Sequence, residues 1–77
     1  MNEGQTKFYH FIIERVYEEK KESAKKLLEE SFSKQASGTF NQEYLESFVN
    51  QMMEMIKPEA KEEVQNIMEN YRKQSMQ

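Results

Sequence analysis

Apolar side chains recur every three or four residues over most of this chain, and this spacing is typical of amphipathic helices. The widest apolar arc lies in residues 44–56, where it covers about half of the helix circumference at ~100° per residue. The centre of this arc is formed by Leu45, Val49, Met52 and Ile56. Because a helix that packs on one neighbour needs a stripe of only about 100°, we expect this helix to contact two neighbours, or one neighbour and a partner chain.

Residues 6–35 contain no Gly or Pro and carry two apolar sets. The first set centres on Ile12 and Val16, and the second is rotated by about 70° around the helix; it comprises Ala24, Leu27, Leu28 and Phe32. Ser23 would cap a new helix poorly, since two lysines would follow in its first turn. We therefore expect one long helix over residues 6–35 that changes its packing partner midway or bends near residues 18–22.

The ends of the elements carry their own signals. Thr6 is the expected N-cap of the first helix. Residues 33–41 form the clearest linker, in which Gly38 suits a left-handed position after a helix and Thr39 with Gln42 fits a capping box. A second helix is expected over 40–56, and Pro58 suits the first position of a third helix over 58–73. We expect residues 1–5 and 74–77 to be frayed, and we find no internal repeat.

These elements predict an all-α fold, with a small three-helix bundle in which an antiparallel helix pair packs on the long N-terminal helix. The composition agrees, because all 14 acidic residues are Glu and the chain has only two Gly and one Pro. Asp, Gly and Pro are the residues that favour turns. Residues 1–77 form one domain, whose core is barely sufficient at this size. Dimerisation would supply further burial.

Several classes of function lack the residues that they need. The chain has no Cys, so disulfides and thiolate chemistry are absent. Neither an apolar run of ~18 residues nor the features of a signal peptide are found, so we expect a cytoplasmic protein without a membrane span. The net charge of −3 argues against nucleic acid or an anionic membrane as the main partner.

His10 is the one histidine, and Glu14 follows it by four residues on the same helix face. Together they would supply half of a metal site, but no second His and no Cys complete it. Di-iron bundles place Glu three residues before His, and here that position is Lys7. We therefore predict no metal, no cofactor, no catalytic residue and no small-molecule substrate, and we interpret the protein as a non-enzyme.

Two surfaces remain as candidates for binding. A basic cluster is formed by Lys20, Lys21, Lys25 and Lys26, although Glu18, Glu19 and Glu22 interleave with it. It supports the alternative of a nucleic-acid-binding regulator.

The other surface is the part of the 44–56 arc that exceeds the needs of a core. This excess apolar surface consists of Tyr44, Met53 and Met55. Flexible methionines and tyrosines are frequent at protein interfaces. The leading hypothesis is a protein–protein interaction or regulatory module that binds an unknown protein or itself as a homodimer.

Overall fold

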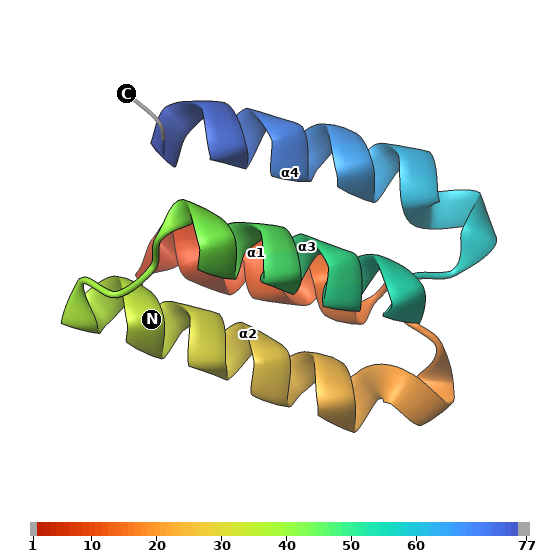
Figure 1. Ribbon diagram of the computed structural model, residues 1–77. Coiled ribbons are helices and arrows are strands. Elements are labelled where there is room, and N and C mark those ends of the chain that lie inside the picture. The colour runs from red at the N-terminus through yellow and green to blue at the C-terminus, as the bar shows by residue number, and fades with distance from the viewer. Residues whose placement is uncertain (1, 76–77) are drawn as a thin grey trace.

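The fold is all-α, as the sequence predicts. The computed structural model describes the backbone of residues 2–75 and the side chains of residues 2–70. Four α-helices and two short 3₁₀ helices follow one another in this part of the chain, and no strand is present there (Figure 1). They are α1 (Glu3–Ile13), η1 (Glu18–Lys20), α2 (Lys21–Ser37), α3 (Gln42–Met55), η2 (Pro58–Ala60) and α4 (Lys61–Ser75).

The expected continuous helix over residues 6–35 is wrong, because the chain leaves the helix after Ile13 and re-enters one at Lys21. Between them, Val16 pairs with Ile56 in an isolated antiparallel bridge. The Tyr17 N–H donates to the Met55 carbonyl at 3.0 Å, and the Lys57 N–H donates to the Arg15 carbonyl at 2.9 Å. Extended backbone is needed for these two bonds, so the helix breaks. The two rotated apolar sets therefore belong to separate helices.

Helices α1 and α3 are each capped by an asparagine, where the sequence analysis predicted a threonine. The Asn2 side chain accepts a hydrogen bond from the Gln5 N–H at 2.8 Å, and the Gln5 side-chain oxygen accepts one from the Asn2 N–H at 3.1 Å. The N-cap of α3 is Asn41, which accepts the Tyr44 N–H at 2.8 Å. The predictions of Thr6 as an N-cap and of a Thr39–Gln42 capping box are therefore wrong. In each case a nearby asparagine oxygen accepts from a first-turn N–H group that has no partner within the helix.

The other boundary signals can be checked against the described residues. Gly38 follows α2 with φ of +76°, and Pro58 opens η2, which leads into α4; both predictions are confirmed. Residues 3–5 are the capped first turn of α1 and residues 74 and 75 continue α4, so both segments that we expected to be frayed contain helical residues. Residues 1, 76 and 77 and the Tyr71 side chain, expected in the third helix's apolar stripe, lie outside the described parts.

The structure shows an internal repeat that the sequence alone did not reveal. Val16 pairs with Ile56, η1 and η2 begin at residues 18 and 58, and α2 and α4 begin at residues 21 and 61. Each of these pairs is separated by the same 40 positions. The molecule is thus two helical hairpins, α1–α2 and α3–α4, which turn at the same end of the bundle (right in Figure 1).

The core follows the same repeat. Four pairs of residues 40 positions apart are each no more than 4% exposed: Ile12 and Met52, Val16 and Ile56, Ala24 and Val64, and Leu28 and Met68. Only apolar side chains occupy these positions, and seven of the 37 positions paired at this spacing are identical, Phe8 and Phe48 among them. The two halves therefore share burial in equivalent places together with a minority of identical residues.

The two seams between the hairpins are not equally closed. Helix α2 packs closely on α3, whereas α1 and α4 approach each other at fewer points. Leu27 on α2 is 8% exposed, and its counterpart Ile67 on α4 is 40% exposed. The bundle is therefore closed on the α2–α3 side and more open on the α1–α4 side.

Replacing Gly38 with alanine should lower the free energy of unfolding by about 1 kcal/mol, since its left-handed φ disfavours any Cβ. No atom lies within 4 Å of a Cβ built there, so the cost would come from the backbone alone. Gly4→Ala is the matched control, because Gly4 lies inside α1 and its Cβ would make only an ordinary contact of 3.5 Å. Urea unfolding measures both variants, and an equal effect of the two would contradict this interpretation.

Candidate functional site

Tyr44 lies in the closed seam between α2 and α3. Its hydroxyl donates to Glu30 Oε1 at 2.8 Å, and its ring lies edge-on to Phe40, with 5.3 Å between centroids. The Lys34 ammonium is 5.4 Å from the centre of the same ring. Burial, and then the hydrogen bond to Glu30 and the charge of its carboxylate, raise the pKa of the Tyr44 phenol. These contacts give Tyr44 a role in holding α2 and α3 together.

Met53 and Met55 are both partly buried against the hydrophobic core. They are two residues apart on α3, so their side chains leave the helix at about 200° to each other. Met53 is nine residues from Tyr44, which is about half a turn around the helix. The three predicted residues Tyr44, Met53 and Met55 therefore do not form one continuous surface.

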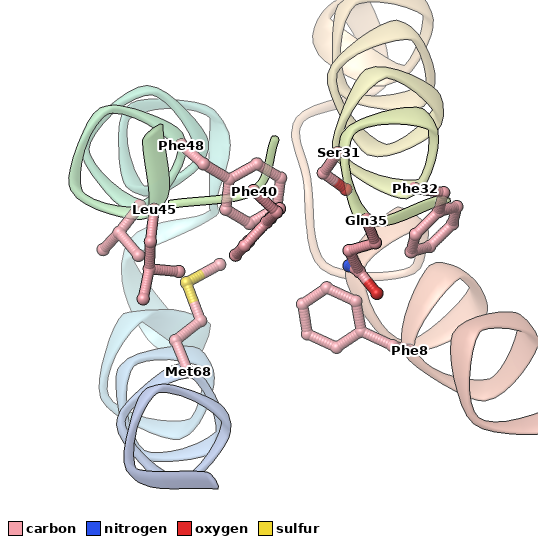
Figure 2. A pocket seen from close by; sticks show the side chains of 9 residues that line it. Phe8, Ser31, Phe32, Gln35, Phe40, Leu45, Phe48 and Met68 are labelled. Atoms are coloured by element: carbon pink, nitrogen blue, oxygen red, sulfur yellow. The ribbon is translucent and has the colours of Figure 1, made fainter. Parts of the chain in front are cut away.

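The structure instead brings a different set of apolar residues together, at the end of the bundle opposite the bridge. The pocket there, which we call the mouth, is lined by Phe8, Ser31, Phe32, Gln35, Phe40, Leu45, Phe48, Val49 and Met68. Figure 2 shows Phe8 and Met68 pointing toward the centre from opposite sides, with Phe40 and Phe48 between α3 and α2. Its volume is about 20 Å³, the space of about one water molecule.

A second cleft adjoins the mouth along the outside of α3 and α4. Its volume is about 240 Å³. Its lining residues are Leu45, Glu46, Val49, Asn50, Met68 and Glu69. Leu45, Val49 and Met68 line both the cleft and the mouth. The two hollows therefore adjoin each other, and we call them together the groove, which is apolar and aromatic at the mouth and carries carboxylates along the cleft.

Sequence reasoning placed several mouth residues in apolar sets but did not find the mouth. Phe8 is in the first helical set and Phe32 in the second, and Phe40 lies in the linker. Helical periodicity tells which face each occupies, but it does not tell which faces meet. Their convergence depends on the break at Val16, which the sequence analysis placed inside a helix.

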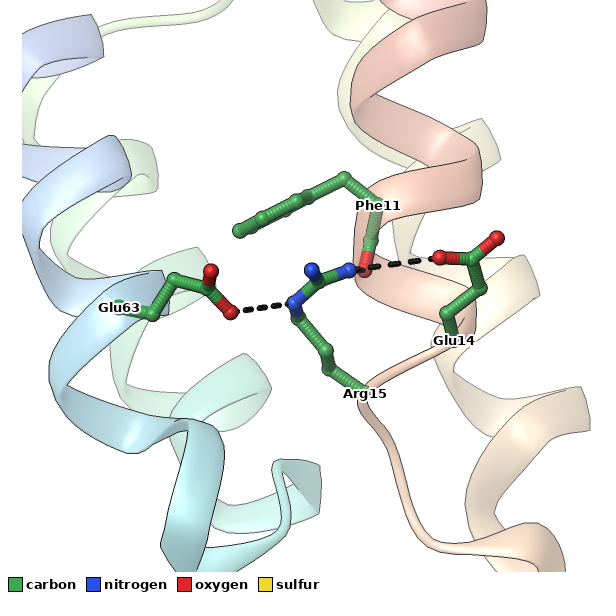
Figure 3. Close-up of polar contacts among 4 residues, drawn as sticks. All are labelled: Phe11, Glu14, Arg15 and Glu63. Carbon is green, nitrogen blue, oxygen red and sulfur yellow. Dashed lines mark hydrogen bonds and ion pairs between the residues drawn. The ribbon is translucent and has the colours of Figure 1, made fainter.

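Arg15 links the two hairpins at the other end of the bundle (Figure 3). Its Nε donates to the Glu63 carboxylate on α4, and its Nη1 donates to the Phe11 carbonyl at 2.9 Å. The guanidinium carbon lies 3.9 Å from the centre of the Phe11 ring, and Glu14 Oε2 is 3.5 Å from Nη1. No signal in the sequence pointed to Arg15, because its main partner is 48 residues away.

The basic cluster is partly neutralised. Lys21 lies 3.0 Å from Glu18 and Lys25 lies 3.6 Å from Glu22. The partners of each pair are three residues apart, within one helical turn, and each pair involves an exposed carboxylate. Half of the predicted nucleic-acid face is thus engaged with acidic neighbours.

His10 is exposed on α1 and its ring meets the Tyr9 ring edge-on at 5.6 Å. Within the described residues, no group of three or more His, Cys, Asp or Glu side chains is arranged to hold a metal ion. Across the same part of the chain, none of the helices has both the length and the apolar character that a membrane span requires.

Comparisons of this chain with protein-family models, with curated proteins and with solved structures gave no match. The candidate site therefore stands on its own geometry.

Replacing Tyr44 with phenylalanine tests the contact with Glu30 through its pH dependence. A raised pKa in the folded state means that the neutral phenol is favoured by folding. This stabilisation is fully present below the ordinary tyrosine pKa of 10.0, and it decreases as the pH rises above that value. The unfolding free energy of the wild type should therefore approach that of Tyr44→Phe above pH 10.0. A constant difference up to pH 11, measured in urea, would contradict the contact.

A double-mutant cycle measures the Arg15–Glu63 pair. The Arg15 side chain is 26% exposed and that of Glu63 is 54% exposed, so solvent screening limits the coupling to about 1 kcal/mol or less. Arg15→Gln should cost more than Glu63→Gln, because it also removes the contacts with Phe11. Equal single-mutant costs in urea unfolding would show that the Phe11 contacts contribute nothing.

Proposed function

We propose that this protein is a non-enzymatic, cytoplasmic protein-interaction module that receives an apolar segment of a partner protein at the mouth. The single observation that carries the proposal is the convergence of four phenylalanines with Met68 at one end of the bundle. Helical proteins commonly bind amphipathic helices in apolar grooves of this kind. Methionine and aromatic side chains adapt to an incoming group by changing rotamer.

The mouth also has a structural means of widening. Its volume of about 20 Å³ has room for about one water molecule and is too small for a partner's side chain. However, Phe8 is on α1 and Met68 is on α4, and these two helices approach each other at few points. The bridge and the Arg15–Glu63 pair hold the hairpins together at the opposite end. A small separation of α1 from α4 therefore opens the mouth without disturbing the bridge.

Binding to a second copy of the chain and binding to nucleic acid are the alternatives. Ile67 on α4 is exposed, and solution mass determines whether the chain self-associates through it. Nucleic-acid binding through Lys20, Lys21, Lys25 and Lys26 is the weaker proposal, because two of the four are in ion pairs. It predicts binding that falls steeply with salt.

Photo-crosslinking tests the mouth directly. A photoreactive residue at Val49, which is half-buried and lines both hollows, should crosslink to one protein partner in cells. The same group at the exposed Gln51 on α3 should not. The partner identified by mass spectrometry is then purified and titrated against Val49→Arg, which should weaken binding at least tenfold.

Gln51→Arg is the matched control, since it adds the same charge to the same helix outside the groove. The proposal fails if both positions crosslink equally, or if Val49→Arg and Gln51→Arg bind the purified partner with the same affinity. A crosslink from Val49 only to another copy of this chain would replace the partner protein with a homodimer.

A further inference from the structure

The cleft beside the mouth has chemistry that restricts what it accepts. Its floor is the apolar surface of Leu45, Val49 and Met68, and its rim carries Glu46 on α3 and Glu69 on α4. The two carboxylates come from different helices, so they flank the floor on both sides. A group that fits this cleft must combine an apolar stem with a positively charged end.

The distribution of charge over the chain favours the same kind of group. Residues 1–41 contain seven acidic and seven basic residues, whereas residues 42–77 contain seven acidic and four basic residues. The whole net charge of −3 therefore belongs to the half that forms α3 and α4. A cationic partner is attracted to this hairpin and an anionic partner is repelled.

Resting on the proposed function, we propose that the groove binds a basic amphipathic helix of a partner protein. One bulky apolar side chain of that helix enters the mouth. A lysine or arginine one turn along, about 5–6 Å away, lays its methylene stem on Leu45, Val49 and Met68. Its charged end then lies between Glu46 and Glu69. Long basic side chains characteristically bury their stems and keep their heads in water, and their hydrogen bonds to carboxylates are strong ones.

A second copy of this chain fits the groove poorly. Two identical faces that meet around a two-fold axis would bring the acidic α3–α4 hairpins together, and like charges across an interface oppose association. A stable dimer also buries about 800 Å² on each partner. The groove is formed by about two turns of α3 facing one turn of α4, which suits a single helix better than a whole domain.

Three synthetic peptides test the charge preference on the full chain. They share the same leucine and phenylalanine positions at helical spacing and carry Lys, Gln or Glu at all polar positions. Titrations followed by fluorescence anisotropy should show binding of the Lys peptide, with an affinity that falls as salt rises. We expect the Gln peptide to bind at least tenfold more weakly and the Glu peptide more weakly still.

Paired variants locate the effect. Glu46→Gln/Glu69→Gln should weaken binding of the Lys peptide about tenfold and leave binding of the Gln peptide unchanged. Glu59→Gln/Glu62→Gln is the matched control, because it removes the same charge from two exposed positions of the same hairpin near the bridge. All four positions are exposed, and thermal unfolding checks that the wild type and both variants are folded at the temperature of the titration.

The outcomes separate this inference from the proposed function. Equal binding of all three peptides, lost in Val49→Arg, would leave the mouth as a binding site and overturn the charge preference. Equal weakening by both double variants would overturn the cleft as the location. Binding of none of the peptides would overturn the inference, while the crosslink from Val49 would still decide independently whether a protein partner uses the mouth.

Discussion

Two backbone hydrogen bonds determine the architecture of this protein. They join Tyr17 to Met55 and Lys57 to Arg15 on either side of the Val16–Ile56 bridge. An isolated helical hairpin of this size could not bury its apolar side, and the bridge holds two hairpins with those sides facing. Val16 and Ile56 are themselves no more than 1% exposed. The two bonds flank this buried pair, and the four residues that make them are half-buried.

The repeat explains the core, and the places where it breaks explain the candidate site. Tyr44 contacts α2 across the α2–α3 seam. The equivalent residue 40 positions earlier, on α1, is Gly4, which has no side chain to make such a contact. Arg15 reaches Glu63 across the other seam, and its counterpart is the apolar Met55. One seam is therefore closed along its aromatic end, and the other is joined mainly near the bridge. The mouth lies where the second seam is least constrained.

Local signals in the sequence predicted the elements, but not their long-range arrangement. Gly38 and Pro58 act through their own backbone geometry, so their positions could be read directly. The break after Ile13 could not, because it follows from hydrogen bonds to residues about 40 positions away. The sites differ for the same reason. The predicted site comprised apolar side chains of a single helix that the core did not need, namely Tyr44, Met53 and Met55. The mouth is instead formed by side chains from four helices and a linker.

The two hairpins use their charged residues differently, although their folds are equivalent. In the first half, charges balance and several form local pairs, such as Lys21 with Glu18 and Lys25 with Glu22. In the second half, acidic residues outnumber basic ones by seven to four. The shared fold requires only the buried pairs, so it leaves the charge of each half unconstrained. The excess negative charge of the second half is therefore independent of the core, and it is one of the observations on which the proposed cationic partner rests.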